Sequence, residues 1–116
     1  MPTVYYRYVS YLPELEQLRD ERKIQSTNPT TQYRTWYTTE RYDSPDIAQQ
    51  RLALKTRPLY RIGPISAEAM PDLTLGPRRV APDFGQPGGG IEVAIDHPVW
   101  LFGVWNFDNQ EWEMLP

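Results

Sequence analysis

The sequence predicts an α+β fold that is dominated by antiparallel sheet. Short runs of β-branched and aromatic residues recur along the chain, whereas two stretches show the apolar spacing of an amphipathic helix. The expected order is strand, helix, loop, strand, helix and then several strands, which differs from the regular alternation of α/β proteins. Twelve prolines and seven glycines among 116 residues indicate many turns between short elements.

Length and composition limit the kinds of site and partner that this chain can have. The chain fits one domain, residues 1–116, with a modest core. It has no cysteine, so it cannot form disulfides or thiolate metal sites. Its single histidine, His97, leaves little basis for a histidine-rich metal site or a histidine-based catalytic triad. The formal net charge of −3 makes nucleic acid an unlikely class of partner, because such proteins usually present a basic face. Without a secretory leader or an apolar run of roughly 20 residues, we expect no membrane insertion.

Residues 4–9 form the first expected strand, and Arg7 lies in its middle between two tyrosines. An arginine in so apolar a strand needs an anion or a carboxylate as its partner. The alternative is an exposed arginine on the polar face of an edge strand. The sequence favours neither interpretation.

Two helices are expected, near residues 11–23 and 45–55. In the first, three leucines share one face, and we interpret the charged residues opposite them as a solvated face. Ser44, Pro45 and Asp46 are typical of a helix start, because they supply a cap, a first-turn proline and a first-turn acid. The side chains expected to be buried on the second helix are Ile47, Ala48, Leu52 and Leu54.

Four more strands are expected. Residues 33–39 and 58–65 are rich in β-branched and aromatic residues. Residues 67–81 are interrupted by proline and glycine, so we expect an irregular segment with a short strand at 78–80. Residues 99–107 are very apolar and are expected to form one last core strand.

A glycine-rich loop delivers Glu92 to the start of another strand. Phe84 begins the run Phe-Gly-Gln-Pro-Gly-Gly-Gly, and Ile91, Val93 and Ile95 then alternate with other residues as in a strand. Glycine suits backbone that takes positive φ or approaches a ligand closely. A rigid strand start is a good place for a catalytic carboxylate. The alternative is a glycine-rich turn with a solvated glutamate.

Arg7, Thr38 and Glu92 all fall on expected strands, and in this order they match the arginine, serine or threonine, and glutamate pattern of ADP-ribosyltransferases. The surrounding sequence resembles the small toxin domains at the ends of Rhs-type polymorphic toxins, in particular the TreTu type, which is named for modifying elongation factor Tu. The resemblance spans roughly residues 5–96. It rests on Tyr6-Arg7-Tyr8-Val9, on Thr35-Trp36-Tyr37-Thr38, on residues 48–54 and, most specifically, on residues 82–92.

This resemblance implies a split β-sandwich with two main helices, which binds NAD as a substrate between its sheets and uses no metal. Glu92 would hydrogen-bond the ribose and stabilise the oxocarbenium-like state in which the bond to nicotinamide breaks. Arg7 would hold the diphosphate or the adjoining ribose, and Thr38 would orient Glu92. Tyr8 belongs to the same NAD-binding set, and Trp36 or Tyr42 would stack on the nicotinamide.

The resemblance also implies a loop that faces the acceptor protein and carries Phe84 and Gln86. Gly90 occupies the position where many of these transferases have Glu or Gln to engage the acceptor. This departure leaves the acceptor side chain open.

The implied function is a mono-ADP-ribosyltransferase toxin that modifies a protein of a competing bacterium, such as elongation factor Tu, and thereby inhibits translation. A cognate immunity protein, delivery by a secretion system within a larger carrier, and action in the cytoplasm of the target cell follow from the same resemblance. Two alternatives remain: an NAD glycohydrolase that depletes the cofactor, and a catalytically inactive binding module.

Overall fold

A computed structural model describes residues 3–10, 12–25, 34–70, 72–101 and 103–114. Within these ranges it contains two α-helices, a 3₁₀ turn at Ala67–Ala69 and nine strands, in agreement with the predicted α+β class. Neither helix is long and apolar enough to cross a membrane. The helices are α1 (Leu12–Glu21) and α2 (Pro45–Arg51), and the strands are β1 (Val4–Val9), β2 (Lys23–Ile24), β3 (Thr35–Tyr37), β4 (Tyr60–Ser66), β5 (Leu75–Arg79), β6 (Ile91–Ile95), β7 (Val99–Trp100), β8 (Gly103–Asn106) and β9 (Glu111–Met114).

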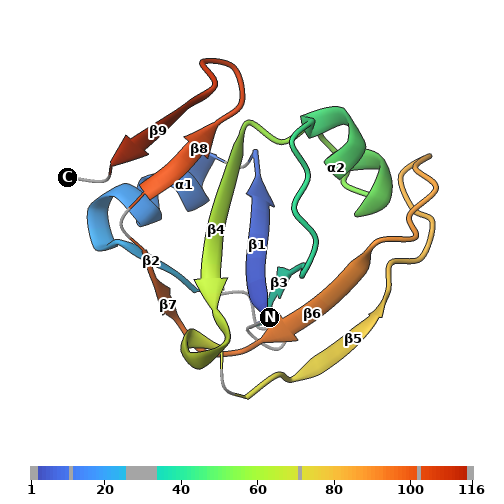
Figure 1. Cartoon of the computed structure of the whole chain (residues 1–116), viewed down its shortest axis with the longest axis horizontal. Coiled ribbons are helices and arrows are strands. Elements are labelled where there is room, and N and C mark those ends of the chain that lie inside the picture. The colour runs from blue at the N-terminus through green and yellow to red at the C-terminus, as the bar shows by residue number, and fades with distance from the viewer. Residues whose placement is uncertain (1–2, 11, 26–33, 71, 102, 115–116) are drawn as a thin grey trace.

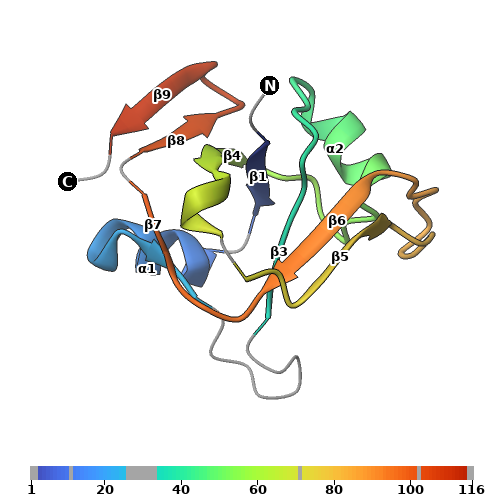
Figure 2. The same cartoon turned by 60° about the horizontal axis from the view of Figure 1, so that its bottom comes forward.

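The described strands form three antiparallel sheets (Figure 1). The largest has the order β1-β4-β8-β9, a second has the order β3-β6-β5, and β2 pairs with β7. The first two sheets are joined where β1 meets the end of β3: the backbones of Tyr6 and Thr38 exchange two hydrogen bonds, each 2.8 Å long. Figures 1 and 2 accordingly show β1 between β4 and β3. Residues of two different sheets therefore lie side by side at this junction.

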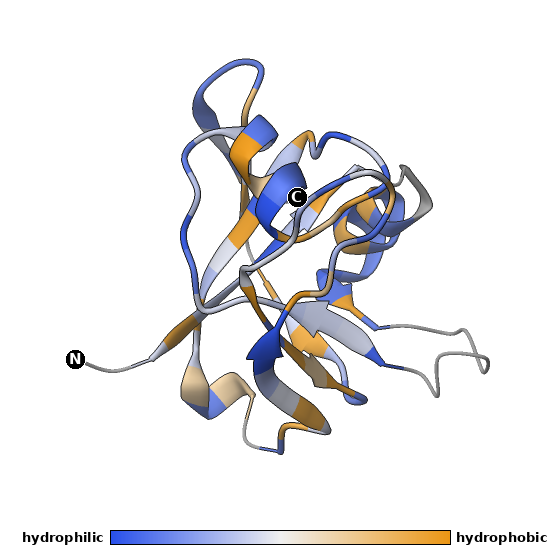
Figure 3. Ribbon diagram, turned by 90° about the vertical axis from the view of Figure 1, so that its right-hand side faces the viewer, coloured by the Kyte–Doolittle hydropathy of each residue, from blue (hydrophilic) through white to orange (hydrophobic). Residues whose placement is uncertain are grey.

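The main core lies between the sheets and α1. Leu15 and Leu18 of α1 pack with Val9 of β1, Ile62 of β4 and Ile95 of β6. Figure 3 shows hydrophobic residues interleaved with hydrophilic ones along the strands, the pattern of sheets with one face against a core. The apolar stripe predicted for the first helix is therefore confirmed at these two leucines. The side chain of Leu12, like residues 11 and 33, lies outside the described part of the chain.

Helix α2 begins as predicted, because the Ser44 side chain accepts the Ile47 N–H at 3.4 Å. It ends at Arg51 rather than near residue 55, since Ala53 has φ +50, which α-helical backbone does not adopt. Ala48 is buried as expected. The predicted burial of Ile47 is wrong: the residue is 50% exposed, because this two-turn helix turns only one side chain fully inward.

The expected single strand over residues 99–107 is also wrong. It is divided into β7, which pairs with β2, and β8, which pairs with β4 and β9. Trp100 is largely exposed, so the apolar run does not mark one buried strand. The strand expected at 78–80 is longer and begins earlier, as β5, because it pairs along β6. The hairpin strand β9 has no counterpart in the sequence prediction; Gln110, with φ 54, lies in its turn.

Candidate active site

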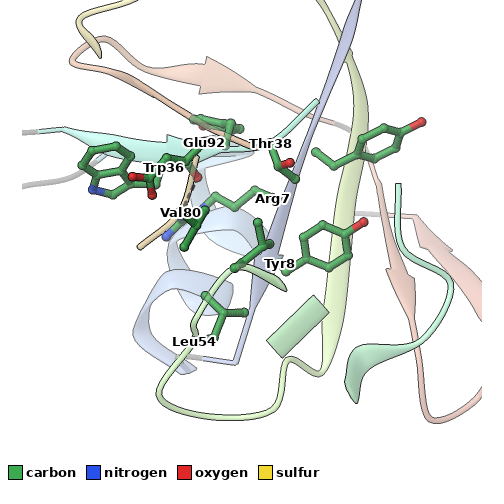
Figure 4. Close-up of a pocket in the computed structure, with 10 residues that line it drawn as sticks. Arg7, Tyr8, Trp36, Thr38, Leu54, Val80 and Glu92 are labelled. Carbon is green, nitrogen blue, oxygen red and sulfur yellow. Dashed lines mark hydrogen bonds between the residues drawn. The ribbon is translucent and has the colours of Figure 1, made fainter. Parts of the chain in front are cut away.

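A pocket opens at the junction of the two larger sheets. Its volume is about 360 Å³ when the solvent at its open side is included. Arg7, Thr38 and Glu92 all line it, so the structure brings the three predicted residues together (Figure 4). The other lining residues are all aromatic or aliphatic: Tyr6, Tyr8, Trp36, Tyr37, Leu52, Leu54 and Val80.

Strand pairing explains this convergence. Trp36 pairs with Ala94 and Tyr37 with Val93, so continuing the register by one residue sets Thr38 beside Glu92. The Tyr6–Thr38 bridge then brings β1 to the same place. Three residues that are far apart in the sequence thus meet through the backbone pairing of their strands.

The Glu92 carboxylate lies at the pocket wall with 22% of its side chain exposed. Its Oε1 accepts a 2.9 Å hydrogen bond from Nε of Arg78, the residue directly across the β5–β6 ladder. The Arg78 guanidinium also lies 5.1 Å from the ring centroid of Trp36, in a cation–π contact. The Glu92 side chain is therefore held in an ion pair with Arg78, and the alternative of a merely solvated turn glutamate does not describe its surroundings.

Thr38 is 1% exposed, and its hydroxyl accepts the backbone N–H of Glu40 at 3.1 Å. This bond uses an oxygen lone pair and leaves the O–H of Thr38 to be donated elsewhere. In the described structure Thr38 makes no hydrogen bond to Glu92. The predicted role of Thr38 in orienting Glu92 stays a prediction.

Arg7 has the carboxylate partner that its position demands. Its Nε and Nη2 donate to the two carboxylate oxygens of Glu14 at 2.5 and 2.9 Å, and its Nη1 donates to the Trp36 carbonyl at 2.8 Å. Burial alone would lower the pKa of the Arg7 guanidinium, but Glu14 more than offsets this and the pKa is raised. The alternative of an exposed edge-strand arginine is wrong. So is the interpretation of the α1 charges as purely solvated, because Glu14 is only 15% exposed.

The hydrogen bonds that Arg7 makes within the protein limit how many it can donate to a ligand. Three of its five N–H groups already have protein acceptors, and these tie together β1, α1 and β3. Any ligand contact must use the two that remain. Arg7 is thus first a residue that fixes the architecture of the pocket.

The aromatic candidates divide into two groups. Tyr8 and Trp36 line the pocket, whereas Tyr42 lies behind Tyr8 with ring centroids 5.6 Å apart. The Tyr8 hydroxyl accepts the Tyr42 N–H at 2.5 Å and donates to the Glu40 carbonyl at 3.2 Å. Burial raises the pKa of Tyr8 above its usual value and that of Tyr42 to about 12. Of the two predicted stacking residues, only Trp36 is on the wall itself.

The glycine loop lies beside α2, as Figure 1 shows, and none of residues 84–90 lines the pocket. Phe84 is more than half exposed, and Gln86 closes a tight turn through backbone hydrogen bonds with Asp83. Gly88 has φ +69, and a Cβ there would lie 2.6 Å from the carbonyl oxygen of Val80. This turn requires glycine at position 88, because the backbone has a positive φ there and passes too close to Val80 to leave room for a Cβ.

Gly90 is buried against the end of α2. A Cβ at this position would lie 2.8 Å from both the Arg51 carbonyl oxygen and the Tyr42 hydroxyl. Packing therefore accounts for glycine where the resembled transferases often carry Glu or Gln. A longer side chain has no room here, so Gly90 does not present a group to an acceptor.

Glu40 and Tyr37 are among the residues of the site that were not anticipated from the sequence. The Glu40 Oε1 accepts the Ile91 N–H and the Tyr42 O–H, each at 2.9 Å, so it fixes the start of β6 immediately before Glu92. Tyr37 also contributes to the pocket wall, and its buried hydroxyl has no hydrogen-bond partner among the described residues. The only sequence signal for Glu40 is an acid just after the strand that ends with Thr38 and Thr39.

No protein-family model, curated protein or solved structure matches this chain. Among the described residues, no group of three or more His, Asp or Glu side chains is arranged to hold a metal ion.

Proposed function

We propose that this chain is a mono-ADP-ribosyltransferase that uses NAD as its substrate, with a split β-sandwich of the ADP-ribosyltransferase type. The observation that carries the proposal is the convergence of Arg7, Thr38 and Glu92 on one aromatic-lined pocket. They come from two antiparallel sheets that are joined at the Tyr6–Thr38 bridge. Two sheets with a cleft at their junction are what the resemblance implies for a split sandwich.

The proposed reaction gives each pocket group a physical task. The bond between C1′ of the ribose and the nicotinamide nitrogen breaks, and its electron pair leaves with nicotinamide. The ribose then carries positive charge, which the Glu92 carboxylate stabilises. A nucleophilic side chain of the acceptor bonds to C1′ and loses its proton. In the proposal, the O–H of Thr38 orients Glu92, and the two remaining N–H groups of Arg7 hold the ribose or phosphate.

The aromatic wall suits the flat parts of NAD. Trp36 and Tyr8 offer ring surfaces on either side of Arg7 in the view of Figure 4. Arg7, Thr38 and Glu92 supply the polar groups of this wall. A largely apolar wall with a few polar groups is the usual composition of a small-molecule site.

The acceptor is proposed to be a protein of a competing bacterium, with elongation factor Tu as the first candidate. The exposed Phe84 and the neighbouring Gln86 support a protein-contacting role for the glycine loop, because an exposed aromatic residue is a common interface anchor. Delivery by a secretion system within a larger carrier, action in the target-cell cytoplasm and neutralisation by an immunity protein belong to the same proposal.

A second candidate, NAD glycohydrolase, is favoured by one observation. Gly90 is buried, so the acceptor-engaging side chain of the resembled transferases is missing. Water would then replace the protein nucleophile at C1′. The pocket residues would keep their tasks.

Biotinylated NAD incubated with a bacterial lysate, and separately with purified elongation factor Tu, distinguishes the candidates. Transfer predicts biotin on a protein with the wild-type chain and a large loss with Glu92→Gln. Glycohydrolase activity predicts free ADP-ribose without labelled protein. If neither product forms, the inactive binding module is favoured and the proposal is overturned.

A further inference from the structure

Arg78 covers the carboxylate on which the proposed reaction depends. It is the cross-strand partner of Glu92 and donates from Nε to Oε1 at 2.9 Å, while its guanidinium lies over Trp36. Both of these partners line the pocket. Arg78 is therefore placed at the pocket edge, where it occupies an oxygen that a ribose hydroxyl would need.

The two arginines of the site differ in how firmly they are held. Arg7 is mostly buried and donates three hydrogen bonds to Glu14 and Trp36. Arg78 has 53% of its side chain exposed, and Glu92 is the only hydrogen-bond acceptor that the described structure gives it. A half-exposed ion pair contributes little to stability, so it exchanges readily for a stronger partner.

We infer that Arg78 is a latch on Glu92: at rest it masks the carboxylate, and an entering dinucleotide uncovers Glu92 by drawing Arg78 onto its diphosphate. A diphosphate offers two negative charges and several acceptor oxygens, which a planar guanidinium binds in a forked manner better than it binds one carboxylate oxygen. This inference deepens the proposed function and rests on it. It assigns Arg78 as the main anion-binding residue of the pocket, in place of Arg7, whose guanidinium is already bonded to Glu14 and Trp36.

The neighbouring Arg79 provides a matched control. It lies on the same strand, is exposed, carries the same charge, and donates to the Gly89 carbonyl at 3.3 Å instead of to Glu92. Because alternate residues of a strand point to opposite faces, Arg79 does not share the position of Arg78. Replacing either residue by alanine changes the net charge equally.

Calorimetric titration with ADP-ribose tests the anion contact, because this ligand has the diphosphate but cannot react at nicotinamide. We expect Arg78→Ala to weaken ADP-ribose binding by about 10-fold or more, the usual effect of losing hydrogen bonds to a charged group. Arg79→Ala should stay within about 2-fold, and Arg78→Lys should lie between the two, because an ammonium keeps the charge but not the fork. Equal affinities for Arg78→Ala and Arg79→Ala would overturn the inference and leave the proposed function standing.

Glu92→Gln tests the latch itself. The amide of this variant can still accept from Arg78 but carries no charge, so Arg78 is held more weakly before the ligand arrives, and ADP-ribose should bind at least as tightly as it does to the wild-type chain. Binding to Glu92→Gln that is as weak as binding to Arg78→Ala would contradict the latch. Failure of the wild-type chain both to bind ADP-ribose and to consume NAD would instead overturn the proposed function, and the inference with it.

Discussion

Arg7 in β1 and Glu14 in α1 form a two-point ion pair in which Nε and Nη2 each meet a different carboxylate oxygen, at 2.5 and 2.9 Å. The pair lies beneath the pocket, and the third bond of Arg7, to the Trp36 carbonyl, extends it to β3. A helix and the two strands that carry Arg7 and Trp36 are thus joined by one guanidinium. The shape of the pocket depends on this connection.

Glu14→Gln should destabilise the fold, because it leaves the Arg7 charge largely buried without a counter-ion. We expect the free energy of unfolding to fall by about 2 kcal/mol, as when one partner of a mostly desolvated charged hydrogen bond is lost. Glu16→Gln is the control, since Glu16 is exposed on the same helix. Urea unfolding of both variants provides the measurement. Equal midpoints for the two would show that the pair contributes nothing to stability.

Gly90→Ala should be destabilising because of two specific contacts. The new methyl group would lie 2.8 Å from both the Arg51 carbonyl oxygen and the Tyr42 hydroxyl, so the glycine loop must move away from α2. We expect a cost of about 1–3 kcal/mol, typical of overpacking.

A double-mutant cycle with Tyr42→Phe tests this cause. Removing the hydroxyl relieves one of the two contacts, so Gly90→Ala should cost less in the Tyr42→Phe background. An unchanged cost would contradict the proposed clash at Tyr42. Denaturant unfolding of the wild type, both single variants and the double variant gives the four values.

How much of the site was predictable depended on the range of the interactions. Arg7, Thr38 and Glu92 were found because each lies in a strand whose pattern is local, and the pairing of those strands brings them together. Glu14 and Arg78 were not assigned as their partners, because nothing in the local sequence distinguishes them from the other charged residues of the chain. A charged side chain is identified as a partner only once tertiary structure places an opposite charge beside it.

The same limit applied to the fold. The helix start at Ser44 was predicted because capping is a local effect, and it is confirmed. The single strand expected over residues 99–107 failed because an apolar run does not specify its partner. Its first part pairs with β2 and its second with β4, which are elements far apart in the chain. Strand partners are a property of the whole sheet rather than of the segment.

Alkaline pH should destabilise the protein through its buried tyrosines. Burial raises the pKa of Tyr42 from 10.0 to about 12, and the pKa values of Tyr8 and Tyr37 are raised in the same direction. Below pH 10 each of these phenols is neutral in both states and the stabilisation is complete. Above pH 10 the unfolded chain loses its phenol protons first, so stability falls as the pH rises towards 12.

Urea unfolding at pH 8, 10 and 11 measures this loss. Tyr42→Phe is the informative variant, because it removes one of the titrating groups and should make the decline between pH 10 and 11 shallower. Tyr60→Phe, which lies in β4, serves as the matched substitution. A decline in Tyr42→Phe as steep as in the wild type would remove Tyr42 from the explanation.

The most direct prediction concerns Glu92. Glu92→Gln keeps the size of the side chain but removes the charge that would stabilise the oxocarbenium-like ribose, so turnover of NAD should fall by about 100-fold or more. Substrate binding should be retained, because the stabilisation develops in the transition state and because Arg78 is released from its ion pair. Thermal melts should differ little from the wild type, since a half-exposed ion pair contributes little to stability.

Glu68→Gln, at an exposed position in the 3₁₀ turn, is the control for a lost surface carboxylate. Nicotinamide release at saturating NAD, measured on folded protein, gives the turnover of each variant. Near wild-type turnover by Glu92→Gln would exclude Glu92 from the mechanism and would remove most of the case for ADP-ribosyl transfer.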